Sequence, residues 1–426
     1  MFFHSISRFN LSRFVNSITS SALIFTGFAA GAHTVQMGDF QQKPILADLG
    51  MLKAVDVPVS YADSANNLGI AYITPQMEQK ISEAAHRMHK CGGFESLEGT
   101  LNPASFTNDS KNIIQSIVDH KRKNQQYSQM RIHRLTINPK PEIEAALADL
   151  KIENLQAWVQ WLSNFPSRYN KLSDPNKHIA PLVERLNQMI AAGKVPAQVD
   201  VIDHNNTKQK SIRVTIPGSN RAQEVVVLGG HLDSIAGWSG SDKAPGADDN
   251  ASGSANLLET LRVVLNQPRP ARTLEFYWYA GEESGLLGSA EIAKAAKAAK
   301  KNVVAVLQLD MTLFPGEGAF NIGSMTDFTS AWLRDYLVAV NDTYLKIKIL
   351  EGECGYGCSD HASWFRNGYP TLMPFEARLN TMNSSIHTPN DVLSNRLNFK
   401  HSLMFSKIAL VMAMDLANST ITQPFH

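Results

Sequence analysis

Residues whose side chains bind zinc recur along this chain in an order that points to one shared site. They are His231, Asp249, Glu283, Asp310 and His387, and a spare acid, Glu282, lies beside the third. Imidazole nitrogens and carboxylate oxygens suit zinc and its neighbouring transition metals. Five such ligands are what two zinc ions require, so the set predicts a metallohydrolase with two Zn2+ ions.

Three apolar, strand-like stretches lead into these residues. In order, they are 226–230 before His231, 274–281 before Glu282 and Glu283, and 303–309 before Asp310. The carboxyl ends of neighbouring strands in an open, mostly parallel sheet line one crevice. We therefore expect these side chains to meet although they are far apart in the sequence.

Strand-like and helical stretches alternate through the chain from about residue 141. The expected strands are 197–203, 211–217, 224–230, 272–280, 303–310, 345–350 and 370–376. The expected helices are 141–150, 154–164, 180–192, 251–266, 284–300, 327–341, 359–367 and 399–418. This alternation predicts an α/β fold with a mixed, largely parallel central sheet flanked by helices.

Each motif alone also has an ordinary structural explanation. His231 could be a hydrogen-bonded residue at a strand end, Asp249 a helix N-cap and His387 a solvated loop histidine. As a metal ligand, His231 would use one ring nitrogen while Asp233, two residues on, orients the other. Consecutive strand residues point in opposite directions, so one of the two adjacent glutamates could bind metal while the other faces the substrate.

Taken together, the motifs resemble the secreted bacterial leucyl aminopeptidase family, whose members carry two zinc ions. The segments that carry the resemblance are Gly230-His231-Leu232-Asp233-Ser234, Pro245-Gly246-Ala247-Asp248-Asp249, Gly281-Glu282-Glu283-Ser284-Gly285-Leu286, Gln308-Leu309-Asp310-Met311 and Ile386-His387-Thr388-Pro389. Segments 354–361 and 373–376 add to it. The resemblance covers roughly 141–418 and leaves 33 to about 135 uncovered.

The resemblance implies a role for each residue of the site. One zinc is held by His231 and Asp310, the other by Glu283 and His387, and Asp249 bridges them. Glu282 corresponds to the general base, and Asp233 to the partner of His231. The implied substrates are peptides with a free N-terminus.

The resemblance also implies an apolar pocket for the substrate's N-terminal side chain. Its expected residues are Met311, Tyr356, Met373, Phe375, Leu379, Met382 and Ile386. Taken singly, each of these residues is commonly found in core packing. As a set they predict a preference for bulky apolar residues, leucine first. Glu376 is the one nearby acid that could instead select Lys or Arg.

The charge of the chain excludes partners that depend on a strong net charge. The 426 residues include 40 basic and 39 acidic ones, which gives a formal net charge of +1. This balance gives no reason to expect attraction to nucleic acid or to a membrane surface. A monomer is expected.

The first 32 residues differ from the rest of the chain. Arg8 and Arg13 precede an uncharged run, 14–32, that ends in small residues. This pattern predicts a signal peptide over 1–32, with an N-terminal anchor as the alternative. We therefore expect a secreted or periplasmic protein.

Two of the three cysteines, Cys354 and Cys358, are four residues apart across two glycines. In an exported chain this spacing makes a disulfide plausible, and two free thiols are the alternative. The third, Cys91, lies outside the predicted chemistry.

The expected organisation has three parts: a signal peptide (1–32), an N-terminal region (33–140) and a dizinc peptidase domain (141–426). The N-terminal region contains amphipathic stretches at 77–88 and 111–122, a short strand-like segment around 57–59, and no ligand motif. It is either a pro-segment that is removed or a permanently attached accessory region. The basic run 121–123 could be a processing site or a solvated helix end.

Other hydrolase classes fit the sequence less well. A serine hydrolase would need Gly-x-Ser-x-Gly, which is absent from the sequence. A papain-like thiol enzyme is disfavoured by the better explanation of Cys354 and Cys358 as a disulfide. A carboxypeptidase, a glutaminyl cyclase or a non-catalytic binding protein could share the fold, but the complete ligand set together with Glu282 favours an aminopeptidase.

Overall fold

A six-stranded mixed sheet carries the strand ends at which the predicted ligands lie. The computed structural model describes residues 42–88, 93–101, 105–129, 135–237 and 243–420. The strands of this sheet are β5 (Gln198–Ile202), β6 (Ser211–Ile216), β7 (Arg221–His231), β8 (Arg272–Tyr279), β9 (Asn302–Gln308) and β12 (Thr371–Leu372). Their order is β12-β9-β7-β8-β6-β5, and the first four run parallel while β6 and β5 are antiparallel to their neighbours. The predicted α/β class is confirmed.

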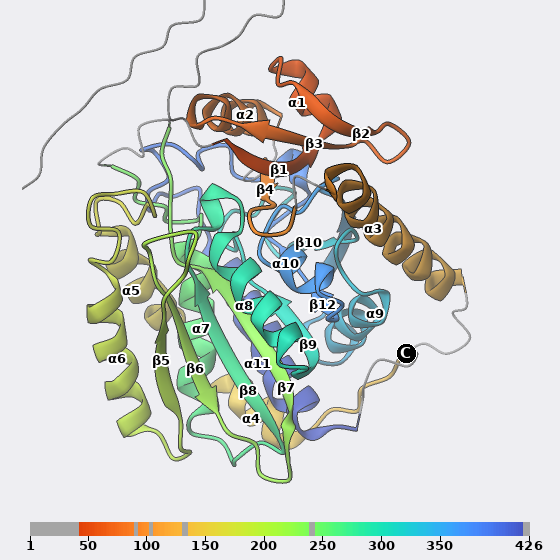
Figure 1. The fold of residues 1–426 in the computed structure, drawn as a ribbon. Helices are drawn as coiled ribbons and strands as arrows, with labels where there is room; N and C mark the ends of the chain where they lie inside the picture. The colour runs from red at the N-terminus through yellow and green to blue at the C-terminus, as the bar shows by residue number, and fades with distance from the viewer. Residues whose placement is uncertain (1–41, 89–92, 102–104, 130–134, 238–242, 421–426) are drawn as a thin grey trace, which may run out of the picture. The chain divides into compact units, whose positions relative to one another are not determined.

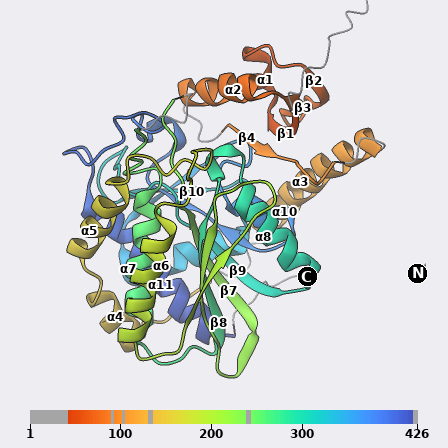
Figure 2. The ribbon, with the colours of Figure 1, turned by 60° about the vertical axis from the view of Figure 1, so that its left-hand side comes forward.

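Helices cover both faces of this sheet. They are α4 (Pro141–Ala148), α5 (Ile152–Ser163), α6 (Ile179–Ala192), α7 (Ala251–Val264), α8 (Leu287–Ala298), α9 (Ala331–Val340), α10 (His361–Arg366) and α11 (Phe399–Asn418). On β7, Val226 and Leu228 pack into the cluster that contains α7 and α11, whereas Val225 and Val227 pack with α8. Figure 2 shows α7 and α11 on one side of the strands and α8 on the other. Because both faces are buried, the central strands are continuous apolar runs.

A smaller sheet in the order β11-β10-β13 contains β10 (Asn321–Met325), β11 (Lys348–Gly352) and β13 (Pro374–Phe375). The single strand expected over 370–376 is divided: β12 pairs with β9, and β13 pairs with β10. Pro374 has no backbone N–H to continue a ladder, which is consistent with this break. Strand β10 was not predicted, because its sequence, Asn-Ile-Gly-Ser-Met, has little strand character.

The N-terminal region contains a sheet of its own, most of which was not predicted from the sequence. It consists of β1 (Lys43–Asp48), β2 (Val59–Asp63), β3 (Leu68–Ile73) and β4 (Phe94–Ser96), in the order β2-β3-β1-β4, with α1 (Leu49–Ala54), α2 (Pro75–Arg87) and α3 (Phe106–Gln129). Buried residues follow one another along β1 and β3 without alternation, so no strand period is visible. Figure 1 shows α3 beside α9.

Some predictions lie outside the described residues. The expected signal peptide, 1–32, is one of them, and Cys91 is another. Among the residues that the structure does describe, no helix combines the length and apolar character needed to cross a membrane.

Candidate metal centre

The five predicted ligands converge at the carboxyl edge of the central sheet. His231 is the last residue of β7, Asp310 follows β9 by two residues, and Glu283 lies in the 3-10 turn η2 (Glu282–Ser284) after β8. Asp249 precedes α7, and His387 lies in the loop before α11. Since β7 lies between β8 and β9, the ends of three adjacent strands form one site.

The ligand atoms form two groups that share one carboxylate. His231 Nε2 lies 3.2 Å from Asp249 Oδ1 and 3.3 Å from Asp310 Oδ1. His387 Nε2 lies 3.0 Å from Asp249 Oδ2 and 3.1 Å from Glu283 Oε2. Within each group all ligand atoms lie within 4.8 Å of one another. Asp249 thus presents one oxygen to each group, which is the arrangement expected of a ligand between two cations.

The electrostatics of the buried site favour added positive charge. Burial raises the pKa of Glu283 to about 7 and that of Glu282 well above its usual range. Burial alone would lower the pKa of His231, but Asp310 and Glu282 raise it well above its ordinary value. Buried Glu283 Oε1 has no hydrogen-bond partner among the described residues. Cations between these nitrogens and oxygens would relieve the repulsion among the buried carboxylates. The donor set of imidazole nitrogens and carboxylate oxygens fits zinc.

Asp233 contacts both His231 and the turn that carries Glu282 and Glu283. Its Oδ1 lies 3.4 Å from His231 Nδ1. It also accepts the backbone N–H groups of Glu282, at 3.0 Å, and Glu283, at 3.2 Å. The sequence indicated only the first of these contacts. A single carboxylate therefore couples the position of the imidazole to that of the turn.

Glu282 and Glu283 do not lie on a strand, so strand alternation does not separate their directions. They lie in η2, which begins after Gly281 in a left-handed conformation. The Glu283 carboxylate belongs to one ligand group, whereas that of Glu282 belongs to neither. Glu282 is buried and close to the charges of His231, Glu283 and Asp310. It is therefore a buried acid beside the two candidate ligand groups that belongs to neither of them.

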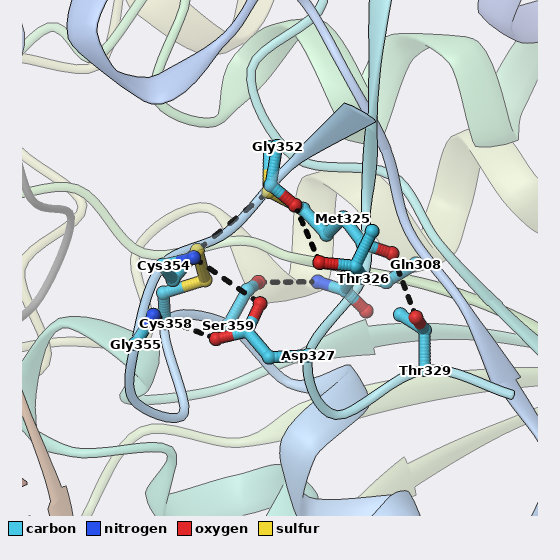
Figure 3. The surroundings of a disulfide bond; sticks show 10 residues. All are labelled: Gln308, Met325, Thr326, Asp327, Thr329, Gly352, Cys354, Gly355, Cys358 and Ser359. Atoms are coloured by element: carbon cyan, nitrogen blue, oxygen red, sulfur yellow. Dashed lines mark hydrogen bonds between the residues drawn. A yellow bond between two sulfur atoms is a disulfide. The ribbon is translucent and has the colours of Figure 1, made fainter. Parts of the chain in front are cut away.

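The residues predicted to line the substrate pocket belong to one apolar cluster. This cluster contains Met311, Met325, Cys354, Tyr356, Cys358, Met373, Phe375, Met382 and Ile386, with half-buried Leu379 packed against it. The predicted Cys354–Cys358 disulfide is present. Figure 3 shows its loop held by Asp327, which accepts the N–H groups of Cys354 and Gly355. The disulfide loop therefore forms one wall of the apolar cluster.

Glu376 is fully buried and has structural partners. Its Oε2 accepts the N–H of Phe314 and its Oε1 accepts the N–H of Asn383, both at 2.8 Å. Burial, followed by the charge of Asp248 and a hydrogen bond to that residue, raises the pKa of Glu376 well above its usual range. These contacts leave it unsuited to the alternative role of a counter-charge for Lys or Arg substrates.

Asp391 supports the site and was not predicted from the sequence. Its two carboxylate oxygens accept the N–H groups of Asp248 and Asp249, each at 3.0 Å. Burial raises its pKa to about 8. The only signal in the sequence was its place four residues after His387, in the same loop. It fixes the backbone from which Asp249 reaches both ligand groups.

Arg168 is a second support that the sequence did not reveal. It is fully buried, with no exposed surface, and its guanidinium donates to four backbone carbonyls. The acceptors are Leu162, Leu232, Pro245 and Gly246, at 2.6–3.0 Å. Leu232 follows His231, and Gly246 begins the turn to Asp249, so Arg168 ties two ligand loops together.

Replacing Arg168 by Met should lower the free energy of unfolding by about 3 kcal/mol or more, because several buried carbonyls would lose their donor. Arg269→Met is the matched control, since exposed Arg269 also donates to two carbonyls, those of Pro217 and Gly218. The control should lose less than about 1 kcal/mol. Urea unfolding of both variants measures the difference, and equal losses would contradict the role given to Arg168.

A mixed sheet whose central strands end at two groups of candidate metal ligands, with the Glu282 carboxylate beside them, is the arrangement of a metal-dependent hydrolase. Residues 211–414 match Peptidase family M28. Leucine aminopeptidase 1 of Trichophyton equinum is 39% identical over 290 residues, which cover 65% of this chain and 76% of that protein. Leucine aminopeptidase 1 of Arthroderma otae is 40% identical over 291 residues, covering 65% and 76%. The chain belongs to peptidase family M28.

Solved structures share the fold. The LapA aminopeptidase of Legionella pneumophila superposes with a TM-score of 0.73 at 24% identity, covering 90% of this chain and 100% of that one. LapB of the same organism gives a TM-score of 0.74 at 22% identity, covering 89% and 100%. Residues 141–426 alone cannot account for this coverage, so the likeness extends into the N-terminal region. The predicted fold is therefore confirmed. The match to peptidase family M28 and the leucine aminopeptidase relatives confirm the predicted enzyme class, a zinc aminopeptidase.

Proposed function

We propose that this M28 peptidase is an exported aminopeptidase of the bacterial leucyl type with two zinc ions. His231 and Asp310 would hold one ion, Glu283 and His387 the other, and Asp249 would bridge them. The observation that carries this proposal is the division of the Asp249 carboxylate, whose Oδ1 faces His231 and whose Oδ2 faces His387.

In the proposed hydrolysis, the metal centre and Glu282 have separate roles. When bound, zinc lowers the pKa of a water and polarises the scissile carbonyl. Glu282 accepts the proton of the attacking water and passes it to the departing amine. The Asp233 carboxylate accepts the backbone N–H of Glu282 and so keeps this residue in place. The same carboxylate orients the imidazole of His231.

Specificity is assigned to the apolar cluster beside the metal centre. Met311 follows Asp310, and Ile386 precedes His387, so the cluster adjoins both ligand groups. A bulky apolar side chain, leucine above all, is the substrate group that such a surface suits. A free N-terminus is required because the substrate's α-amine is to be held at the metal centre.

A panel of aminoacyl anilides, with metal analysis on the same sample, tests the proposal. Leucine anilide should be cleaved fastest, the lysine and arginine anilides much more slowly, and N-acetyl-leucine anilide not at all. Turnover with two zinc ions per chain distinguishes an aminopeptidase from a binding protein on the same fold. Faster release of Lys or Arg than of Leu would contradict the proposed pocket.

The proposed organisation is a signal peptide over 1–32, an N-terminal region over 33–140 and a dizinc peptidase domain over 141–426, in a monomer. Export to the periplasm or the medium is supported by the Cys354–Cys358 disulfide, because such bonds persist in oxidising compartments. The mature protein is expected to act on peptides and to bind neither nucleic acid nor membranes.

A further inference from the structure

The turn that carries Glu282 and Glu283 has an unusual backbone. Gly281, Gly285 and Leu286 all have positive φ, at 63°, 102° and 63°. A left-handed conformation is uncommon for a leucine and persists only where its surroundings impose it. The turn therefore depends on contacts from outside itself.

Those contacts come from two sides. Asp233, in the loop after β7, accepts the N–H groups at the front of the turn, as described above. The carbonyls at the back of the turn are bound by the N-terminal region. Lys43 Nζ donates to Ser284 O at 3.1 Å, and the N–H of Ser96 donates to Gly285 O at 3.0 Å.

Side-chain packing strengthens this second side. A Cβ on Gly285 would lie 2.8 Å from both Phe94 Cε2 and Ser96 N, so β4 fills the space against the turn. Leu286 is buried in a cluster with residues of the N-terminal sheet and of α3. The sheet contributes Leu46, Leu68 and Ile70, α3 contributes Ile114 and Ile117, and Leu97 follows β4 directly.

Charged groups attach the N-terminal sheet at two further points. The Glu78 carboxylate of α2 lies 3.0 Å from Lys43 Nζ and 2.5 Å from Lys171 Nζ. The ion pair with Lys171 joins α2 to the peptidase domain. Glu95 of β4 lies 2.6 Å from Arg366 of α10, and both side chains are largely buried. Removing the N-terminal region would break both ion pairs and leave the partly buried charges of Lys171 and Arg366 without their partners, which is unfavourable.

The basic run 121–123 lies inside α3. Arg122 pairs with Asp119 one turn earlier, and Lys121 lies 3.5 Å from Glu353. Cleavage there would require this part of the helix to unfold first, because exposed loop tips, and not helices, are the preferred sites of proteolysis. Removal of the region would also expose Leu286 and its apolar neighbours Phe328 and Phe365.

We propose that residues 42–129 remain with the peptidase domain in the active enzyme, and that Lys43 and Phe94 are positioning residues for the Glu282–Glu283 turn. The proposal rests on the proposed function, since it concerns the acid that moves the proton. Small displacements of such a group are costly, and a shift of about 1 Å can reduce the rate about 100-fold.

Lys43→Met and Phe94→Leu test this in the full-length enzyme. Lys43→Met removes the donor to Ser284 O, and Phe94→Leu removes the ring beside Gly285. The matched controls are Lys53→Met, at an exposed lysine of α1, and Met51→Leu, at a buried position among α1, α2 and the sheet. kcat and KM on leucine anilide, the rate of zinc release to a chelator, and Tm are measured for all four.

Both test variants should lose about 10-fold in kcat with KM changed less than about twofold, and should release one of their two zincs faster, because Glu283 shares the turn. The controls should behave as the wild type. If Tm fell while kcat and the rate of zinc release stayed unchanged, the contacts of Lys43 and Phe94 with the turn would contribute only to stability. That result would overturn the proposal. An active purified enzyme that lacks 42–129 by mass spectrometry would also overturn it. A wild type without zinc or turnover would instead refute the proposed function, and this inference with it.

Discussion

Glu282→Gln is expected to lower kcat about 100-fold or more while the fold and the zinc content stay those of the wild type. The amide keeps the size of the side chain but cannot accept the proton of the attacking water. Glu282 belongs to neither ligand group, so its loss should not release metal. Steady-state kinetics on leucine anilide, with metal analysis of the same preparation, measure both quantities.

Glu283→Gln is the matched comparison, because it makes the same change one residue further along the same turn. This variant should lose the zinc held with His387, since Glu283 Oε2 lies 3.1 Å from His387 Nε2. Unchanged turnover in Glu282→Gln, or zinc loss from it, would mean that the roles of the two glutamates are reversed.

The convergence of the five candidate ligand residues could be predicted because three of them follow apolar strands. His231 ends β7 and Asp310 lies two residues beyond β9. Parallel strands place their carboxyl ends at one edge of a sheet whatever their separation in sequence. The arrangement of Glu282 and Glu283 was predicted for the wrong reason. The two side chains are not directed apart by strand alternation, because both residues lie in a 3-10 turn between two residues with positive φ. Positive φ angles of this kind are set by tertiary contacts, which the sequence does not reveal.

Supports of the site were not predictable, because their partners are backbone groups. Arg168 binds four carbonyls and Asp391 binds two N–H groups, and every residue type offers such groups. No pairing of residue types in the sequence marks these contacts. Glu376 remained ambiguous for a related reason, since only its burial against Asp248 distinguishes a structural acid from a specificity residue.

The N-terminal sheet was not predicted because its two central strands, β1 and β3, are buried on both faces and show no alternation of apolar and polar residues. Strands β1 and β3 each bury a run of consecutive residues, and strand β4 has only three residues. A short apolar run without alternation cannot be assigned to strand or helix from its period. The same burial is what connects the region to Leu286 and the acidic turn.

Asp249→Ala is expected to remove both zinc ions, because this is the one residue common to the two ligand groups. Its Oδ1 lies 3.2 Å from His231 Nε2 and its Oδ2 lies 3.0 Å from His387 Nε2. His231→Ala and His387→Ala are the comparisons, and each should weaken mainly one ion because each belongs to one group. Metal analysis after dialysis against a weak chelator measures the stoichiometry of all three variants. Two zincs retained in Asp249→Ala would exclude a bridging role, and the loss of one zinc alone would place Asp249 in a single group.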